Sequence, residues 1–317
     1  MTTDSASSYD AVPYQSNPFA QSQPDRLAVV ARLFGLQPTL PSNAKVLELG
    51  CAGGGNLIPL AARYPNATFH GIDFSARQVA LAQAQIAALA LTNIRIETGD
   101  ITTFAPPEKF DYIICHGVYS WVPEATRAAI LRICRDALTP HGVAYVSYNA
   151  YPGWRLREVV REAMLFHAGA HADTTQRLTQ GRAFLQFMQQ ASDPASIFGQ
   201  MLKIESDMIA NFRDDYVLHE HLEQHNAPCY FKDFMAQAGE HRVRIAAVGG
   251  IEEAERGQRC GHAHGSPLPC DVTRRRRDRA GRRVRSRTDG GARPRAAARR
   301  PARPRRPRRG RDLDRAW

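Results

Sequence analysis

Three acidic side chains lie at or near the ends of apolar runs of the chain and could together hold a polar ligand. Glu48 lies in the stretch VLELGCAGGGN, Asp73 follows a second apolar run 25 residues later, and Asp100 follows a third. The glycines of the first stretch, among them Gly50 and Gly53, allow the backbone to approach a ligand closely. This first loop contains no Lys or Arg. The pattern therefore favours a hydroxyl-bearing or cationic ligand over a phosphate, which prefers helix N–H groups and basic side chains.

The positions of these acids predict an adenosine-like ligand. An acid at the end of the second strand of a nucleotide-binding α/β unit binds a ribose hydroxyl pair, which is the role expected of Asp73. Asp100 is a candidate partner for an adenine amino group, and Glu48 suits an ammonium or sulfonium. Two phosphate-binding motifs do not fit, because Gly55-Asn56-Leu57 lacks the Lys of a P-loop and Ala52 replaces the second glycine of G-x-G-x-x-G.

The elements that must position these residues alternate in type. The expected strands are 45–49, 67–72, 94–98, 112–115 and 143–148, and the expected helices between them are 56–64, 75–91 and 124–138. The segment LTPHG (138–142) is expected to be a turn. Strands and helices alternating at this spacing indicate right-handed βαβ units, so we predict a doubly wound, mainly parallel α/β sheet. Ligands of such sheets bind beyond the carboxyl ends of the strands.

The rest of the chain differs in character from this core. We expect an N-terminal cap segment (1–42) with a short helix from Pro24, the α/β core (43–152), a helical appendage (153–214), the truncated start of a further domain (215–250) and an Arg-rich tail (251–317). The appendage is expected to contain helices at 155–167, 174–190 and 195–211. A minimal α/β domain has no such addition.

Charge is distributed unevenly along the chain. The formal net charge of +11 combines −3 over residues 1–250 with +14 over residues 251–317, which hold 22 Arg and no Lys. The expected folded part is therefore not basic, and net charge alone does not indicate nucleic-acid binding. The tail has too few apolar residues to form a core, so we expect it to be disordered. Its excess of Arg, Ala, Gly and Pro, whose codons are rich in G and C, favours out-of-frame translation.

The amino-acid sequence shows no signal for export, membrane insertion, disulfide bonds or metal binding. No basic segment followed by an apolar one opens the chain, and the most apolar stretch (79–91) is too short to span a bilayer. The six cysteines form no CxxC pair, which predicts reduced thiols in a cytoplasm. His219, His221 and His225 match no zinc motif, so we interpret them as a polar helix face.

The motifs ELGCAGGG, GIDFS and TGD resemble those of class I S-adenosylmethionine-dependent methyltransferases. The phrases FDYIICHGVYSWVP, YNAYPGW and HEHLEQHNAPCYFKDF narrow the resemblance to bacterial members with an appended methyltransferase regulatory domain, which include rickettsial protein-lysine methyltransferases. The resemblance covers roughly residues 9–240. It implies a Rossmann-like fold and S-adenosylmethionine as the cofactor. The residues that it implies around the cofactor are Glu48, Gly50 and Gly53 at the methionine part, Asp73 at the ribose, Phe74, Asp100 and Ile101 at the adenine, and His116 with Gly117 at the sulfonium.

Aromatic residues after the fourth and fifth expected strands are candidates for the acceptor site. Tyr119, Trp121 and Tyr151, together with Tyr148 and Trp154, could surround an aliphatic ammonium. Aromatic residues at strand ends also often complete a core, and both interpretations stay open. The fourth strand is not followed by the D/N-P-P-Y/F motif typical of enzymes that methylate planar amides or adenine amino groups.

These observations predict methyl transfer from S-adenosylmethionine, with a protein side-chain amine (lysine) as the favoured acceptor by resemblance. Methylation of a small molecule on nitrogen or oxygen is the alternative within enzymes. An alternative of another class is a nucleic-acid-binding protein that acts through its Arg-rich tail. The motifs specify a cofactor and leave the acceptor and the oligomeric state open.

Deletion of residues 251–317 is expected to change the free energy of unfolding by less than about 0.5 kcal/mol, because the tail should bury almost no apolar surface. Denaturation of the full and shortened chains under identical conditions measures this difference. Protection of the tail from proteolysis would contradict the expectation. The encoding DNA, read in another frame, should continue the regulatory domain; early stop codons in that frame would also contradict it.

Overall fold

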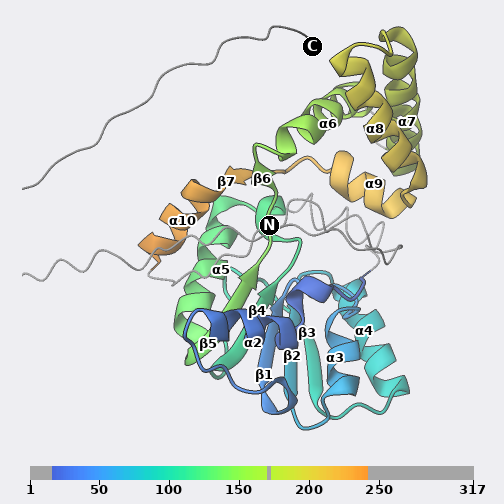
Figure 1. Cartoon of the computed structure of the whole chain (residues 1–317). Helices are drawn as coiled ribbons and strands as arrows, with labels where there is room; N and C mark the ends of the chain where they lie inside the picture. Colours follow the sequence, from blue (N-terminus) through green and yellow to red (C-terminus); the bar gives the residue numbers. More distant parts are fainter. Residues whose placement is uncertain (1–15, 170–172, 242–317) are drawn as a thin grey trace, which may run out of the picture. The chain divides into compact units, whose positions relative to one another are not determined.

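A five-stranded parallel sheet forms the centre of the chain. The computed structural model describes residues 16–169 and 173–241, so the expected disorder of 251–317 lies outside the described residues. The strands are β1 (Lys45–Leu49), β2 (Thr68–Asp73), β3 (Ile94–Thr98), β4 (Phe110–Cys115) and β5 (Leu138–Val146), in the spatial order β3-β2-β1-β4-β5 (Figure 1). The predicted doubly wound sheet is thus confirmed. Strand order reverses between β1 and β4, which makes their carboxyl ends the expected ligand-binding point.

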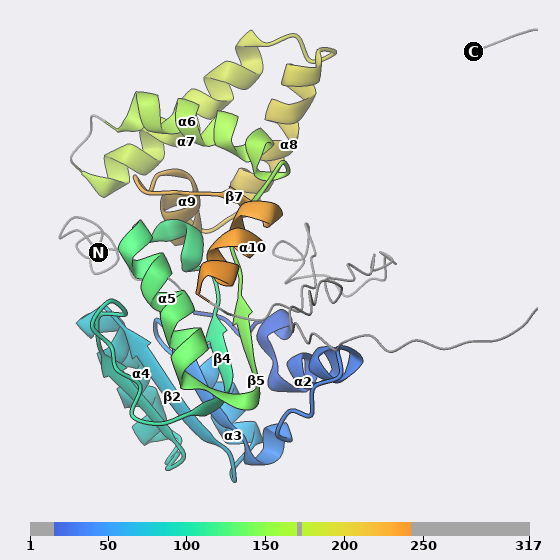
Figure 2. The same cartoon turned by 90° about the vertical axis from the view of Figure 1, so that its left-hand side faces the viewer.

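Helices cover both faces of this sheet (Figures 1 and 2). The helices of the core and its flanks are α2 (Pro24–Leu33), α3 (Leu57–Arg63), α4 (Ala76–Ala88), α5 (Glu124–Ala137) and α10 (Phe231–Glu240). Residues of α2, α3 and α4 pack with Val46 and Ile114, whereas residues of α5 and α10 pack with Leu47 and Ile113. Successive strand residues point to opposite faces, so a strand that is buried throughout, such as β4, needs a helix layer on each side.

One predicted turn is instead part of a strand. The segment Leu138–Gly142 was expected to separate a helix from a strand, but β5 already begins at Leu138, which pairs with Phe110. The register shifts between Phe110 and Tyr112, which accommodates the irregular stretch. Pro140 is tolerated because β5 is an edge strand and does not need every N–H for pairing. The other four strands begin within two residues of their predicted positions.

The helical appendage has a core of its own. It consists of α6 (Trp154–Ala168), α7 (Thr174–Ala191), α8 (Ile197–Asn211) and α9 (Asp214–His221). Apolar residues such as Val160, Leu202 and Val217 are buried together in a cluster separate from the two clusters of the sheet. The side chains of Asp173 and Ser196 accept hydrogen bonds from the first turns of α7 and α8, which fixes where these helices begin.

A short pair of strands links the end of the core to the residues after the appendage. In this pair β6 (Ala150–Tyr151) lies parallel to β7 (Cys229–Tyr230). The four cysteines in the described part of the chain are free and buried. Across the described ranges, no helix combines the length and the apolar character needed to cross a membrane.

Candidate cofactor and acceptor site

The loops after β1 and β4 touch at the point where the strand order reverses. Gly50 has a φ of +73°, and a Cβ built on it would lie 2.5 Å from Cγ2 of Val118. A side chain at this position would therefore meet both backbone strain and a steric clash. Gly53, further along the loop, is buried, with Oε1 of Gln78 3.2 Å from where its Cβ would be. The glycines thus allow the two loops to close on one another.

Glu48 is a buried carboxylic acid that lacks one partner. Its side chain lies on β1 and is 3% exposed. One oxygen, Oε1, accepts a hydrogen bond of 2.8 Å from Nδ2 of Asn56, but Oε2 is buried without a partner among the described residues. Burial raises the pKa of Glu48 to about 8, with Asp73 adding to the rise and the Asn56 bond opposing it. A cationic group placed beside Oε2 would satisfy this oxygen and favour the ionised form.

Asp73 ends β2 with its carboxylate oriented by two backbone groups. The N–H of Ala52 donates to Oδ2 at 2.7 Å, and the N–H of Ser75 donates to Oδ1 at 2.9 Å. A carboxylate has about four acceptor positions, and these two bonds use one on each oxygen. The side chain therefore lies between the glycine loop and the start of α4.

The third acid, Asp100, lies beyond the end of β3. Its Oδ1 accepts from the backbone N–H and the hydroxyl of Thr102, both at 2.8 Å. Partial burial acts to raise the pKa of Asp100, but these two bonds outweigh it and keep the pKa below its ordinary value. Ile101 is 7% exposed and belongs to the core, whereas Phe74 is 37% exposed. Because β1, β2 and β3 are neighbours, the structure brings the three acids to one edge of the sheet.

His116 follows β4 and lies against the N-terminal segment. Its Nδ1 is 3.2 Å from Oγ of Ser147 and 3.3 Å from the hydroxyl of Tyr145. The ring centroid of Phe19 lies 3.7 Å from that of His116. Burial lowers the pKa of His116 to about 4, so the imidazole is neutral at neutral pH. The residue therefore adds no positive charge to this end of the site.

The three acceptor candidates have separate surroundings. Tyr119 is 1% exposed, and its hydroxyl donates to Oε1 of Gln237 at 2.8 Å, so it fills the core beneath α10. Trp121 lies edge-on to Trp154, with ring centroids 6.3 Å apart. Tyr151 donates to Oε1 of Glu158 at 2.6 Å. The contacts of these residues therefore form three separate groups, not a single ring of aromatic side chains around one point.

Each acceptor candidate also has an arginine of this chain near its ring. The guanidinium carbons of Arg127, Arg161 and Arg155 lie 6.0, 5.9 and 3.9 Å from the ring centroids of Tyr119, Trp121 and Tyr151, respectively. These distances are typical of cation–π contacts.

Residues that follow the appendage hold the loop after β4. The N–H of Ala227 donates to the carbonyl of Ser120 at 2.7 Å. The ring Nε2 of His225 is 2.9 Å from the carbonyl oxygen of Val122. Local sequence patterns do not predict these contacts, because they join residues about a hundred positions apart. They fix the backbone that carries Tyr119 and Trp121.

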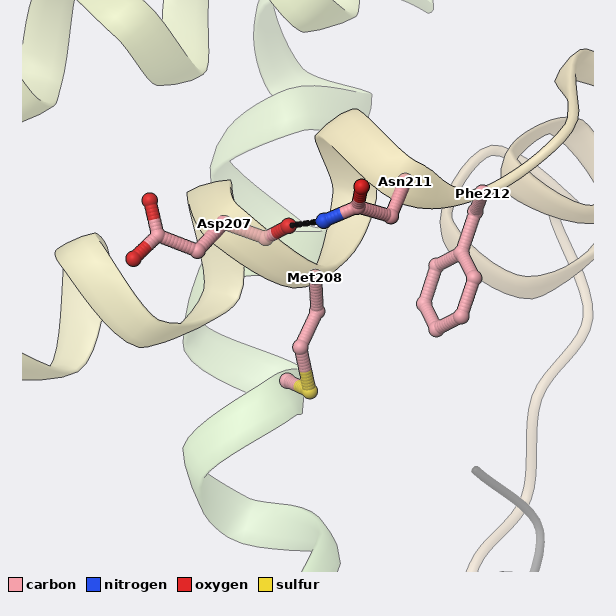
Figure 3. Close-up of a pocket in the computed structure, with 4 residues that line it drawn as sticks. All are labelled: Asp207, Met208, Asn211 and Phe212. Carbon is pink, nitrogen blue, oxygen red and sulfur yellow. Dashed lines mark hydrogen bonds between the residues drawn. The ribbon is translucent and has the colours of Figure 1, made fainter. Parts of the chain in front are cut away.

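A hollow in the appendage lies outside this set of residues. It has a volume of about 330 Å³ and is lined by Asp207, Met208, Asn211 and Phe212 of α8 and its end (Figure 3). Nδ2 of Asn211 donates to the backbone carbonyl of Asp207, whose carboxylate pairs with Lys203 at 2.8 Å. None of its lining residues was predicted to bind the cofactor or the acceptor. In the described part of the chain, His, Cys, Asp and Glu form no group of three or more suited to a metal ion.

Comparison with known proteins identifies the family. Residues 46–142 match a family described as "Methyltransferase domain", and residues 213–248 match a "Predicted methyltransferase regulatory domain". One uncharacterized protein of Rickettsia prowazekii is 42% identical over 241 residues, which are 75% of this chain and 44% of the relative. A second one is 35% identical over 233 residues, which are 73% of this chain and 93% of the relative. PKMT2 of Rickettsia typhi, solved in complex with AdoHcy, is 35% identical with a TM-score of 0.66, covering 72% of this chain and 44% of that one.

The chain therefore belongs to the class I S-adenosylmethionine-dependent methyltransferases, in the group with a methyltransferase regulatory domain. It spans less than half the length of the first of these relatives and of PKMT2. The family predicted from the motifs is confirmed, and so is its cofactor, S-adenosylmethionine.

The substitution Glu48→Gln is expected to flatten the dependence of stability on pH. The pKa of Glu48 is about 8 in the folded chain and near 4.5 when unfolded, so between these values the unfolded state loses its proton first. Stability should therefore fall as pH rises from about 4.5 to about 8, and glutamine, which cannot ionise, should remove the part of this fall that Glu48 causes. Urea unfolding at pH 5, 6, 7 and 8 measures the effect. Glu124→Gln, on the exposed first turn of α5, is the control, and an equal flattening there would contradict the assignment.

Proposed function

We propose that this chain transfers the methyl group of S-adenosylmethionine to an amine, and that the acceptor is a lysine side chain of a protein. The observation that carries the cofactor part is the buried carboxylate of Glu48, which has an unpartnered oxygen at the reversal point of the sheet. Burying a carboxylate in this way is unfavourable unless a cation or a donor completes its contacts. The ammonium of an amino-acid ligand is such a group.

The residues of the strand ends fit the rest of the cofactor. We assign the methionine part to Glu48, Gly50 and Gly53, the ribose hydroxyls to Asp73, the adenine to Phe74, Asp100 and Ile101, and the sulfonium end to His116. The cofactor supplies an electrophilic methyl group on a positively charged sulfur. The neutral imidazole of His116 is compatible with that charge, and the glycine loop admits close approach of the backbone.

The acceptor must be deprotonated and aligned with the methyl group. A lysine ammonium has an ordinary pKa near 10.4, and desolvation lowers it, which favours the nucleophilic amine. Alignment at about 3–3.5 Å is the main requirement for an in-line displacement. We assign acceptor positioning to Trp121 and Tyr151, and to Tyr119 as their buried support. Resemblance to rickettsial protein-lysine methyltransferases supports a protein acceptor.

The proposal is tested by incubating the purified full chain with methyl-labelled S-adenosylmethionine and a bacterial extract. Label recovered as methyl-lysine after hydrolysis of the protein fraction supports the proposal. Label in a small molecule would replace the lysine acceptor with the alternative stated above. If no methyl transfer is found and the chain binds DNA, the nucleic-acid-binding alternative is favoured. That DNA binding should be lost when residues 251–317 are deleted.

Asp73→Ala is expected to lower the affinity for S-adenosylmethionine at least about tenfold. The substitution removes a carboxylate that we assign to two ribose hydroxyls, and hydrogen bonds of this charge-assisted kind contribute about 1.5–3 kcal/mol each. Isothermal titration calorimetry measures the affinity, and circular dichroism checks the fold. Unchanged affinity would contradict the ribose assignment, and binding of NAD in its place would indicate a dehydrogenase.

Alanine at Trp121, Tyr151 or Tyr119 is expected to lower methyl transfer while leaving cofactor affinity within about threefold, less than 1 kcal/mol. The reason is that these residues are assigned to the acceptor and not to the cofactor. Labelled transfer into the extract and calorimetry give the two readouts. Phe166→Ala, at a 90% exposed position of α6, is the control. Joint loss of stability and cofactor binding in all three variants would mean that the residues only complete the core.

A further inference from the structure

Residues 16–22 of the N-terminal segment lie across the glycine loop; we name them the strap. The N–H of Gly55 donates to Oγ of Ser16 at 2.9 Å. A Cβ on Gly55 would lie 2.2 Å from the backbone oxygen of Ser16, so the two backbones approach as closely as glycine permits. Any residue with a side chain at position 55 would push the strap away from the loop.

Asn56 joins the strap to the candidate cofactor site. It is 1% exposed, and its Oδ1 accepts from the N–H of Phe19 at 3.0 Å and from Oγ of Ser22 at 3.2 Å. Its Nδ2 donates to Oε1 of Glu48 at 2.8 Å. One amide group therefore uses its oxygen for the strap and its nitrogen for the carboxylate. These contacts fix the orientation of the amide, because only the nitrogen can donate to Glu48.

The position of Asn56 makes this arrangement unusual. It is the N-cap residue of α3, where an asparagine side chain ordinarily accepts from the first turn of the helix. Here the side chain makes no such capping bond. The helix end thus forgoes a stabilising contact, and the side chain is directed to the strap and to Glu48. Helix capping does not explain why the residue is an asparagine.

The strap also reaches the opposite side of the site. Phe19, whose N–H is bonded to Asn56, packs its ring against His116 in the loop after β4, with centroids 3.7 Å apart. His116 is assigned to the sulfonium end, and Glu48 to the ammonium end, of the same cofactor moiety. The strap therefore spans from one end of the methionine part to the other.

We propose that the strap is the outer wall of the methionine part of the cofactor site, and that Asn56 is a positioning residue. Through Asn56, binding of the cofactor at Glu48 holds the strap against the glycine loop. The inference rests on the proposed function, since it needs S-adenosylmethionine at these residues. When an ammonium meets Glu48, the carboxylate becomes a charged acceptor, and its bond from Asn56 becomes charge-assisted and stronger. The amide is then held more firmly, and so are the two strap groups that donate to its oxygen.

The first test compares two ligands of the full chain by calorimetry. S-adenosylhomocysteine has the amino-acid end, whereas 5′-methylthioadenosine lacks it. Asn56→Ala is expected to lower affinity for S-adenosylhomocysteine at least about tenfold and for 5′-methylthioadenosine less than about threefold. Ser22→Ala removes one donor to Asn56 and leaves Glu48 its partner, so it serves as the milder variant if Asn56→Ala is unstable. Phe19→Ala should weaken S-adenosylhomocysteine binding, whereas Phe34→Ala, an exposed phenylalanine beyond the strap, should not.

The second test follows the strap itself by hydrogen exchange. Adding S-adenosylhomocysteine to the unmodified chain should slow exchange in peptides that cover 16–22 and 50–57. In Asn56→Ala, ligand at saturation should protect only the glycine loop. If the unmodified chain binds neither ligand, the proposed function itself fails. A different result would overturn the strap proposal and leave the cofactor assignment standing. In that result S-adenosylhomocysteine binds and slows exchange in the glycine loop, but exchange in the strap is unchanged. The variants Phe19→Ala and Ser22→Ala also bind the ligand normally.

Discussion

A carboxylic acid buried at the carboxyl end of the central strand is the constraint around which the site is arranged. Glu48 has only 3% exposure, because β1 is a central strand and helices cover both faces of the sheet. A buried carboxylate is stable only if partners replace the water it has lost, and Asn56 provides one of the two that its oxygens require. Burial raises the pKa of Glu48 to about 8, and the nearby Asp73 adds to the rise.

The parallel topology determines which other residues surround this acid. Because β2 and β3 lie next to β1 on one side, Asp73 and Asp100 lie with Glu48 at the carboxyl ends of the strands. Because β4 adjoins β1 on the other side, the loop that contains His116 and Val118 meets the glycine loop. A ligand bound at this point would contact loops from both halves of the sheet, which is how doubly wound sheets usually bind nucleotides.

The region after the appendage is joined to the same part of the core. Ala227 and His225 bond to carbonyl groups of the loop after β4, and Gln237 accepts from the hydroxyl of Tyr119. These residues lie within the match to the regulatory domain. Residues that match the regulatory domain therefore contact the loop that we assign to the acceptor, whereas the N-terminal strap contacts the glycine loop. Two segments far apart in sequence thus contact the two loops of one site.

The sequence by itself determined the doubly wound, mainly parallel sheet and the cofactor. Alternating apolar runs and helical segments predicted four of the five strands closely, because local periodicity reports burial on both faces. It misjudged β5, since Pro140 and Gly142 signal a turn unless an edge strand and a register shift accommodate them. The three acids were found because each lies within two residues of the end of a strand. Only the tertiary structure decided that Tyr119 is buried and that Asn56 joins Phe19 to Glu48, because contacts between distant segments leave no local pattern.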